Sequence, residues 1–474
     1  YSDLGDQLMQ CSHCNANMWY DERISKCART TNPRFSLCCG GGKVELPLLQ
    51  NPPKYLYQLL YDHDTSDSKN YQQNIRTYNM MFAFTSAGIK FDKSNNHSRG
   101  PPTIRIQGQP CHRIGSMLPM PVKEPKFAQL YIFDTENEVQ NRINAISSPH
   151  NQIQRHIVSQ LSEMLDEYNV HAKTFRMTRD RLQDGQVDNI KLKLIANREK
   201  DGCTYNVPTV PKVVALIVGD FDENSKRDII IETRPRQSQR IHELHSSYLA
   251  LQYPLLFLYG EDGYRPDILH CSAPDGKKRK RNRLTMREWF SYRLQCRSNE
   301  SKTLLNSRRL FQQFVVEGYT MVESERHSYI INNQKKLRVD KVILPSTFVG
   351  NPRYMDQLYF DGMAICNHVG FPNLFITLTC NPNRPEIHRL LNPLNLKAID
   401  RPDIISRVFK LKYEQMLMEL TKNQMLGKVI AYIYTIEFQK QGLPHVHLLL
   451  FLHPDNKYPS SDEIDQIISV EIPS

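Results

Sequence analysis

The chain has 474 residues, of which 40% are hydrophobic and 23% charged, a composition typical of folded proteins with more than one domain. Its formal net charge of +11 favours polyanionic partners, with nucleic acid first. The apolar runs are too short to span a bilayer, so no membrane partner is expected. The first residue is Tyr1 and not Met, and we therefore interpret the sequence as a fragment of a longer protein.

Residues 1–50 are predicted to form a small cysteine-rich unit. Five of the 11 cysteines lie here: Cys11, Cys14, Cys27, Cys38 and Cys39. Without a secretory signal, such crowding favours metal binding over disulfides, and C-x-x-C spacing lets two thiolates bind one ion with little strain. We predict a structural zinc ion held by Cys11, Cys14, Cys38 and Cys39, with His13 or Cys27 as alternatives for the fourth ligand. The competing interpretation is free cysteines in a small core.

Residues 51–284 are predicted to form a β-rich middle region with helices. Glycine and proline separate short strand-like runs: MMFAFTSAGIKF, PTIRIQG, AQLYIFD, VVALIVGD and DIIIETR. Apolar residues at helical spacing predict helices over Asn137–Asn169 and Gln239–Leu251. The pattern of this region indicates a fold but no chemistry.

A basic run, KKRKRNR, follows near the end of the middle region. Its charged residues are Lys277, Lys278, Arg279, Lys280, Arg281 and Arg283. Such a run is typical of a nuclear localisation signal or of an arm that contacts phosphates, and the alternative is a solvated loop. Trp19 and Trp289 are candidates for base stacking, but Trp289 lies in a helical apolar pattern and is predicted to belong to the core.

Residues 285–474 are predicted to form one α+β domain. A helical region over Thr285–Asn333 precedes the strand NLFITLTC, a helix over Pro402–Gln424, the strands VIAYIYTIEF and HVHLLLFL, and a helix that starts in SSDEIDQIISV. The order β, α, β, β, α predicts an antiparallel-centred α/β sandwich.

The strand HVHLLLFL carries two histidines in a strongly apolar setting. His445 and His447 are two residues apart and therefore project from the same face of a strand. The opposite face is apolar too, so the strand should lie in the middle of a sheet that is covered on both faces. If VIAYIYTIEF pairs with it as a hairpin, Glu437 can share the histidine face, and the three side chains can bind Mg²⁺ or Mn²⁺. The alternative is two hydrogen-bonded core histidines and a solvent-exposed glutamate.

Three stretches together resemble the helicase-like N-terminal region of Helitron transposon proteins. They are GYTMVESERHSYI, FPNLFITLTCNPNRPEI and IEFQKQGLPHVHLLLFL. The resemblance is close from about Trp289 to the end, and looser over CSHCNANMWYDE…FSLCCGGGKVELP. Helitron proteins are rolling-circle transposases whose Rep part is an HUH endonuclease.

The resemblance implies a metal-dependent DNA endonuclease fold and a nuclear protein. His445 and His447 match the paired HUH histidines, and Glu437 is the best match for the third metal ligand. In this family a divalent cation, Mg²⁺ or Mn²⁺, polarises the scissile phosphate of single-stranded DNA, and a tyrosine attacks it. Residues 378–381 match the first Rep motif, which contributes the adjoining strand and the wall of the site. A helicase domain is expected in the full-length protein.

The sequence departs from the family after the histidine pair. In the family the nucleophilic tyrosines lie on a helix downstream, whereas Tyr458 is the one tyrosine between His447 and Ser474. We therefore expect this chain to be unable to nick and religate DNA alone. The alternative is a domesticated or degenerate protein that binds nucleic acid without catalysis.

Overall fold

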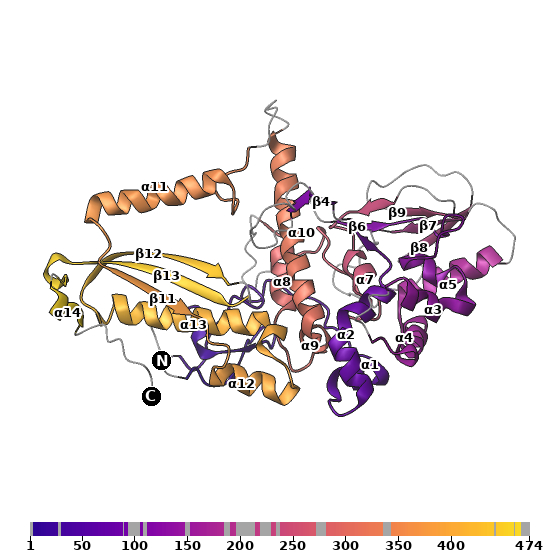
Figure 1. The fold of residues 1–474 in the computed structure, drawn as a ribbon, viewed down its shortest axis with the longest axis horizontal. Coiled ribbons are helices and arrows are strands. Elements are labelled where there is room, and N and C mark those ends of the chain that lie inside the picture. The colour runs from indigo at the N-terminus through magenta and orange to yellow at the C-terminus, as the bar shows by residue number, and fades with distance from the viewer. Residues whose placement is uncertain are drawn as a thin grey trace. The chain divides into compact units, whose positions relative to one another are not determined.

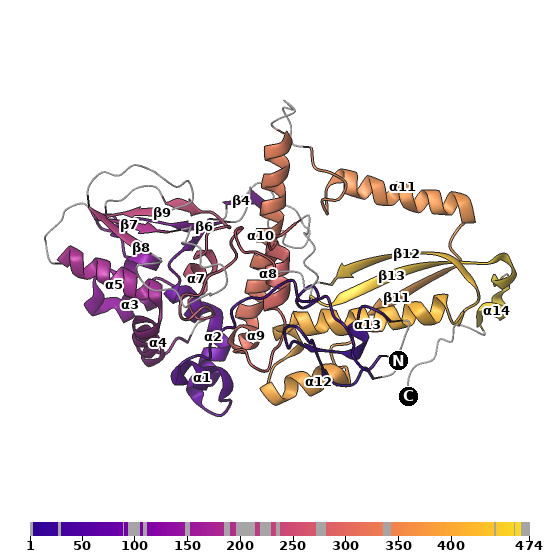
Figure 2. The same ribbon diagram turned by 180° about the vertical axis from the view of Figure 1, so that it is seen from behind.

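The computed structural model of the chain is shown in Figures 1 and 2. It describes residues 3–26, 30–88, 90–92, 105–107, 111–146, 152–183, 190–195, 214–218, 229–233, 238–271, 281–334, 343–439, 442–458 and 460–465. Among these residues, no helix combines the length and the apolar character that crossing a membrane requires.

The chain divides into two compact units. The N-terminal unit comprises Leu8–Glu325, and the C-terminal unit comprises Arg326–Ser474 together with Tyr1–Gln7. The sequence boundaries near residues 50 and 284 both fall inside the N-terminal unit. Both units combine helices with small antiparallel sheets, which confirms the α+β class.

The N-terminal unit is built mainly of helices. They are α1 (Lys54–Tyr61), α2 (Ser66–Phe82), α3 (Glu138–Asn144), α4 (Arg155–Tyr168), α5 (Val170–Gln183), α7 (Tyr248–Gln252), α8 (Met286–Arg293), α9 (Thr303–Asn306) and the first part of α10 (Arg308–Gln334). Short 3-10 helices cover Tyr20–Glu22, Phe127–Tyr131 and Thr135–Asn137.

Its strands form small sheets. They are β1 (Met9–Gln10), β2 (Asn17–Met18), β3 (Ser86–Ala87), β4 (Lys90–Asp92), β5 (Arg105–Gln107), β6 (His112–Ile114), β7 (Ile190–Leu194), β8 (Val214–Val218), β9 (Ile229–Glu232) and β10 (Gln239–Ile241). The sheet orders are β1-β2, β4-β5, β10-β6-β3 and β8-β7-β9, and all of these pairs are antiparallel.

The core of this unit depends on aromatic contacts between helices. Helix α8 begins with a capping box in which Thr285 and Glu288 each accept a hydrogen bond from the other's backbone amide. On α10, Gly318 allows the Phe290 ring to approach, because a Cβ atom there would lie 2.7 Å from that ring. Phe290 in turn packs on Phe314 with ring centroids 5.4 Å apart.

The prediction of a β-rich middle region is wrong for its described part. Helices α2, α4 and α5 have 17, 14 and 14 residues, whereas the longest strands described there have five. The run MMF ends α2, because Ile75, Tyr78 and Phe82 extend its buried helical stripe. The run AQLYIFD contains a 3-10 helix in place of a strand, and the buried ring of Tyr131 stacks on Phe84 there.

Two predicted helices also differ from the structure. The segment expected as one helix over Asn137–Asn169 forms two, α3 and α4, and Gln239–Leu251 begins as strand β10 before α7. The apolar residues before and after Pro149 follow one helical spacing, which is why the sequence predicts a single helix. Proline, however, disfavours a helical conformation in the residue that precedes it, here Ser148. Residues 147–151 lie outside the described part.

The C-terminal unit contains a three-stranded antiparallel sheet with helices on both sides. Its elements are α11 (Pro352–Val369), β11 (Leu374–Thr379), α12 (Pro385–Leu391), α13 (Pro402–Thr421), β12 (Val429–Phe438), β13 (Pro444–Leu452) and α14 (Ser461–Asp465), with 3-10 helices at Asn392–Leu394, Ala398–Asp400 and Pro454–Asn456. The strand order is β11-β13-β12. Figures 1 and 2 show α13 along one side of this sheet and α11 on the other.

The N-terminal residues pack within the C-terminal unit. The backbone amide of Leu4 donates to Glu386 Oε1 (3.0 Å), and Glu386 forms a buried ion pair with Lys412 of α13 (2.7 Å). Arg389 of α12 pairs with Asp3 and Asp6 at 2.7 and 2.6 Å. Residues 3–6 therefore bind α12, and Glu386 of α12 in turn binds α13.

Candidate metal centres

Cys11 and Cys14 lie in a turn that joins two short strands. β1 and β2 pair with Met9 opposite Met18. The turn is closed by hydrogen bonds from Asn15 N–H to Cys11 O (2.9 Å) and from Cys11 N–H to Ala16 O (3.0 Å). The closed turn holds both thiols of the C-x-x-C pair on one side of the hairpin end.

Cys38 and Cys39 lie in a second turn that requires glycine. Gly40, Gly41 and Gly42 have φ of 62, 70 and 82°, in the left-handed region that glycine adopts without strain. A Cβ atom at Gly42 would lie 2.8 Å from the Nδ1 atom of His13. The amide of Gly42 donates to Cys39 Sγ at 3.2 Å, so this turn supplies a backbone donor to the cysteines.

The two turns bring four thiols together. The sulfur atoms of Cys11, Cys14, Cys38 and Cys39 all lie within 4.8 Å of one another. The distance from Cys11 Sγ to Cys39 Sγ is 3.7 Å, and that from Cys38 Sγ to Cys39 Sγ is 3.8 Å. Four sulfurs around a tetrahedral zinc ion, at about 2.3 Å each, are about 3.8 Å apart. The cluster therefore has the spacing of a closed four-thiolate metal site.

The thiols of the cluster differ in the direction of their pKa shifts. Hydrogen bonds from Cys14, Cys38 and Cys39 lower the pKa of Cys11. The hydrogen bond to Cys11 is the main cause that raises the pKa of Cys38 and of Cys39. Four thiolates this close repel one another unless a cation is present, and a divalent metal supplies that charge. The arrangement can therefore hold a metal ion such as zinc.

Other predictions for this part of the chain have different outcomes. Cys39 is the fourth member of the cluster, and His13 lies over Gly42. Cys27 lies outside the described residues. Trp19 and Trp289 are each 1% exposed, so base stacking by Trp19 is wrong and the core position of Trp289 is confirmed.

The predicted hairpin of β12 and β13 is present in the C-terminal unit. Glu437 pairs with His445, and Thr435 pairs with His447. On the other side of β13, Thr379 pairs with His445 and Thr377 with His447. Because paired residues of adjacent strands share a face, Glu437, His445 and His447 project from one face of the sheet. We call this side of the sheet the histidine face.

The two faces of the sheet differ in burial. Val446, Leu448 and Leu450 are 0% exposed on the side of α13. His445, His447 and Leu449 are only half-buried on the histidine face. Helix α11 approaches this face, where a Cβ atom at Gly362 would contact Ile433 at 3.9 Å, but none of its residues is buried. The expectation of a sheet covered on both faces is therefore met on the α13 side and wrong on the other.

Neighbouring side chains orient both imidazoles. Thr379 Oγ1 lies 2.8 Å from His445 Nδ1, within hydrogen-bond distance. Phe375 of β11 stacks on His447 with ring centroids 5.4 Å apart and planes 7° apart. The two imidazole rings meet edge to face at 4.6 Å. If His445 Nδ1–H donates to Thr379, its Nε2 atom is free to bind a cation.

The three predicted ligands do not converge as closely as the cysteines. The Nε2 atom of His447 is 3.9 Å from Glu437 Oε2. Among groups of three or more possible ligands in the described residues, the four cysteines alone have ligand atoms that all lie within 4.8 Å of one another. The Glu437 side chain is 66% exposed, so it can change rotamer to meet a cation. His447 Nδ1 is buried and has no hydrogen-bond partner, so one polar atom of this imidazole is unsatisfied.

Tyr458 lies at the wrong end of the hairpin for attack at the histidine face. Its hydroxyl donates to Leu426 O at 2.9 Å, just before β12 begins. Glu437 and His445 pair near the opposite end of the same hairpin. About eight strand residues, at about 3.3 Å each, separate the two ends. Tyr458 is therefore held away from the three predicted ligands.

The basic run is described only at its end. Lys277, Lys278, Arg279 and Lys280 lie outside the described residues. Arg281 and Arg283 are exposed, and Arg283 forms an isolated antiparallel bridge with Leu269. Their exposure is compatible with phosphate contacts and equally with a solvated loop.

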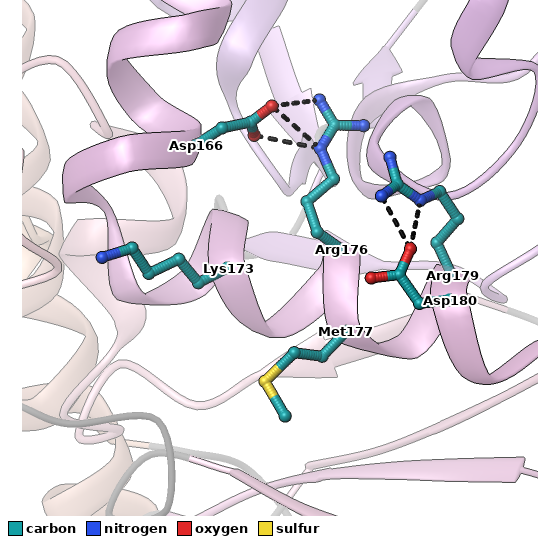
Figure 3. Close-up of a pocket in the computed structure, with 6 residues that line it drawn as sticks. All are labelled: Asp166, Lys173, Arg176, Met177, Arg179 and Asp180. Carbon is teal, nitrogen blue, oxygen red and sulfur yellow. Dashed lines mark hydrogen bonds and ion pairs between the residues drawn. The ribbon is translucent and has the colours of Figure 1, made fainter.

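A shallow pocket on α4 and α5 offers no comparable chemistry. Figure 3 shows its lining residues, Asp166, Lys173, Arg176, Met177, Arg179 and Asp180. Arg176 binds Asp166 through both carboxylate oxygens, and Arg179 binds Asp180 at 2.7 Å. Carboxylates within the pocket already pair its guanidiniums, so an anion would have to compete with them.

The sequence interpretation missed the side chains that orient the histidines. Thr379 and Phe375 belong to β11, the strand that leads into the first Rep motif at residues 378–381, and this motif was expected to contribute the adjoining strand and the wall of the site. Their contacts depend on which strand borders β13 and in which register. The alternation of side chains along β11 could have identified them, since it places Phe375, Thr377 and Thr379 on one face of the strand.

Comparison with known proteins relates part of the chain to one family. The model of the Helitron helicase-like domain at the N-terminus matches residues 289–342 and 340–450. The match covers α8 through most of β13, including the histidine face, and does not include the cysteine cluster. No curated protein matches the chain. Residues 289–450 are therefore identified as a Helitron helicase-like domain.

Proposed function

We propose that the histidine face binds a divalent cation, Mg²⁺ or Mn²⁺, together with single-stranded DNA. The chain would act in DNA nicking and strand transfer as part of a Helitron-type rolling-circle transposase in the nucleus. The observation that carries this proposal is the register of β13 with its neighbours, which aligns Glu437, His445 and His447 on one half-open face.

The chain's own residues would prepare the site. A bound cation would polarise a non-bridging oxygen of the DNA phosphate. Thr379 fixes the ring of His445, and Phe375 fixes the ring plane of His447, so both imidazoles are oriented before a cation binds. Glu437 would supply the negative charge that hard cations prefer. The histidine face is only half-buried, which would let a DNA strand approach it.

We further propose that the cysteine cluster binds zinc as a structural ion. Its sulfur spacing, its burial and its four thiols support this role, because closed four-thiolate sites stabilise folds and leave no open position for chemistry. Lys277, Lys278, Arg279, Lys280, Arg281 and Arg283 would contact DNA phosphates or direct nuclear import.

Mn²⁺ binding to the full chain tests the histidine face. In paramagnetic resonance titrations, we expect the wild-type chain to bind Mn²⁺ and the His445→Ala/His447→Ala variant to lose that binding. His453→Ala is the matched control, since His453 lies just beyond β13 and accepts a hydrogen bond from Asp455 N–H instead. Equal Mn²⁺ affinity in the double variant and the wild type would refute the site.

Binding of a labelled single-stranded oligonucleotide tests the partner. We expect Mn²⁺ to strengthen binding to the wild-type chain but not to the double histidine variant, and affinity to fall with rising salt. DNA binding that is equal with and without the cation favours the second candidate, a nucleic-acid-binding protein without catalysis. The position of Tyr458, at the far end of the hairpin, is the observation that favours this candidate.

The position of Tyr458 also predicts that this chain forms no covalent link to DNA. Wild-type chain incubated with Mn²⁺ and single-stranded DNA should give no adduct that survives denaturation. An adduct that disappears in the Tyr458→Phe variant would contradict this expectation.

A further inference from the structure

Arg297 is a buried arginine that contacts the cysteine cluster. It lies in the segment between α8 and α9 and is 1% exposed. Its Nε–H donates to Cys14 O at 3.0 Å, and its Nη2 atom lies 3.9 Å from Cys14 Sγ. The guanidinium also stacks over the ring of Tyr292, 3.6 Å from its centroid. Arg297 is therefore a cationic side chain that contacts Cys14 from outside the two cysteine turns.

The charge of Arg297 is only partly matched by its other partner. Arg297 pairs with Glu300 Oε2 at 2.9 Å, but Arg293 pairs with Oε1 of the same carboxylate, also at 2.9 Å. Arg293, Arg297 and Glu300 are all nearly inaccessible to solvent. The Glu300 carboxylate is thus shared between two buried guanidiniums, and the other carboxyl that acts on them, Glu261, acts on Arg293. Buried charge without an opposite charge is costly, so the remaining positive charge favours an anionic group next to Arg297.

Backbone contacts tie the same two segments together. Ala16 and Arg297 form an antiparallel bridge, and Asn17 N–H donates to Cys296 O at 2.9 Å. Leu49 N–H donates to Glu300 Oε1 at 3.1 Å, and Arg293 donates to Pro47 O. The cysteine hairpin therefore pairs with the segment that opens the Helitron helicase-like match at residue 289.

We propose that Arg297 is the counter-charge of a metal–thiolate cluster and couples metal binding to the packing of residues 292–301. This inference rests on the proposed binding of zinc by the four cysteines. A divalent ion with four thiolates carries a net charge of −2, and Arg297 and the Gly42 amide are positioned to donate hydrogen bonds to its sulfurs. Arg297 is a positioning residue, because it acts through Cys14 and does not bind the metal.

Zinc affinity of the full chain, measured by chelator competition, tests the proposal. We expect Arg297→Met to weaken zinc affinity roughly 10–100-fold, the usual effect of losing an outer-shell partner. Arg297→Lys keeps the charge and should lose less. Arg293→Met is the matched control, since it removes the other buried guanidinium on Glu300 without touching Cys14. It should lower thermal stability and weaken zinc affinity less than Arg297→Met does, because the guanidinium that lies against Cys14 Sγ is retained.

A second measurement needs no variant. Removing zinc from the wild-type chain with a chelator should raise amide hydrogen exchange in residues 292–301 more than in α4, which lies in the same unit. This result decides the question if Arg297→Met fails to fold.

The outcomes separate the two claims. Wild-type zinc affinity in Arg297→Met, or unchanged exchange in residues 292–301 on zinc removal, overturns the role of Arg297 and leaves the zinc site standing. A wild-type chain that binds no zinc, and gives no thiolate charge-transfer band with Co²⁺, overturns the zinc site itself.

Discussion

The cysteine cluster and the histidine face are two candidate metal centres that differ in solvent exposure and in how closely their ligand atoms converge. The cysteine cluster is closed: Cys11, Cys38 and Cys39 are 1% exposed, and four sulfurs converge within 4.8 Å. The histidine face is open, with Glu437 66% and His447 33% exposed and ligand atoms that do not converge. Structural metal sites fill every coordination position with protein atoms, whereas reactive sites keep positions open for substrate. Under the proposed function, the first centre would serve folding and the second would serve chemistry.

The largest expected effect is the loss of stability when the ligands of the cysteine cluster are removed. The Cys11→Ser/Cys14→Ser variant should lose its zinc and be destabilised by more than ~3 kcal/mol, since structural zinc contributes ~10–16 kcal/mol of binding free energy in small zinc domains. Zinc content and thermal unfolding measure this. Cys296→Ser, a half-buried cysteine outside the cluster, is the control. Equal zinc content in both variants and the wild type would show that the cysteine cluster does not bind zinc, and its contrast with the histidine face would fail.

The next effect separates the two faces of β13. Leu448→Ala should cost ~2–5 kcal/mol of unfolding free energy, the usual cost of emptying a fully buried leucine site. Leu449 is its neighbour on the half-buried histidine face, and Leu449→Ala should cost less than half as much. Chemical denaturation of both variants tests this. Equal losses would show that the histidine face is as tightly packed as the α13 side.

The two units should also differ in how their stability depends on pH. Burial raises the pKa of Glu261 in the N-terminal unit to about 7. In the C-terminal unit, burial of Glu386 is outweighed by hydrogen bonds from Lys412 and Leu4, which lower its pKa. A raised carboxyl pKa means that the folded state binds more protons, so the stability from Glu261 is complete below about pH 4.5 and is lost as pH rises toward 7. The stability from Glu386 is complete above about pH 4.5 and is lost as pH falls further.

Glu261→Gln tests this pH dependence. The variant should be more stable than the wild type at pH 8 by about 1–3 kcal/mol, and the difference should vanish near pH 4. Glutamine retains the acceptor for the amide of Tyr259. Denaturation curves from pH 4 to pH 8 measure the effect, and parallel curves for the two proteins would contradict it.

The smallest effect concerns the orientation of His445. Thr379→Val removes the hydroxyl that lies 2.8 Å from Nδ1 and should weaken Mn²⁺ binding about 10-fold, the lower end for the loss of an outer-shell partner. Thr377→Val is matched in chemistry, strand and face, and the structure describes no hydrogen bond from Thr377 to a histidine. Titrations with Mn²⁺ that rank the two variants equally would remove the role of Thr379.

Prediction from the sequence succeeded where the pattern was long and local. The strands β11, β12 and β13 and the helix α13 lie close to where alternation and helical spacing placed them. It failed in the middle region, where the runs MMF and AQLYIFD are too short to distinguish strand from helix. Their conformation depends on buried partners such as Phe84 and Tyr131, which are far apart in the sequence.

The sequence by itself determined which residues can carry chemistry. C-x-x-C spacing identified the first cysteine pair, and the two-residue period of a strand placed His445 and His447 on one face. The tertiary structure decided which other groups meet them: Cys39 as the fourth thiol, Arg297 against Cys14, Thr379 against His445, and an open histidine face. The physical reason is that strand register and burial are set by contacts between segments far apart in the chain, which no local pattern encodes.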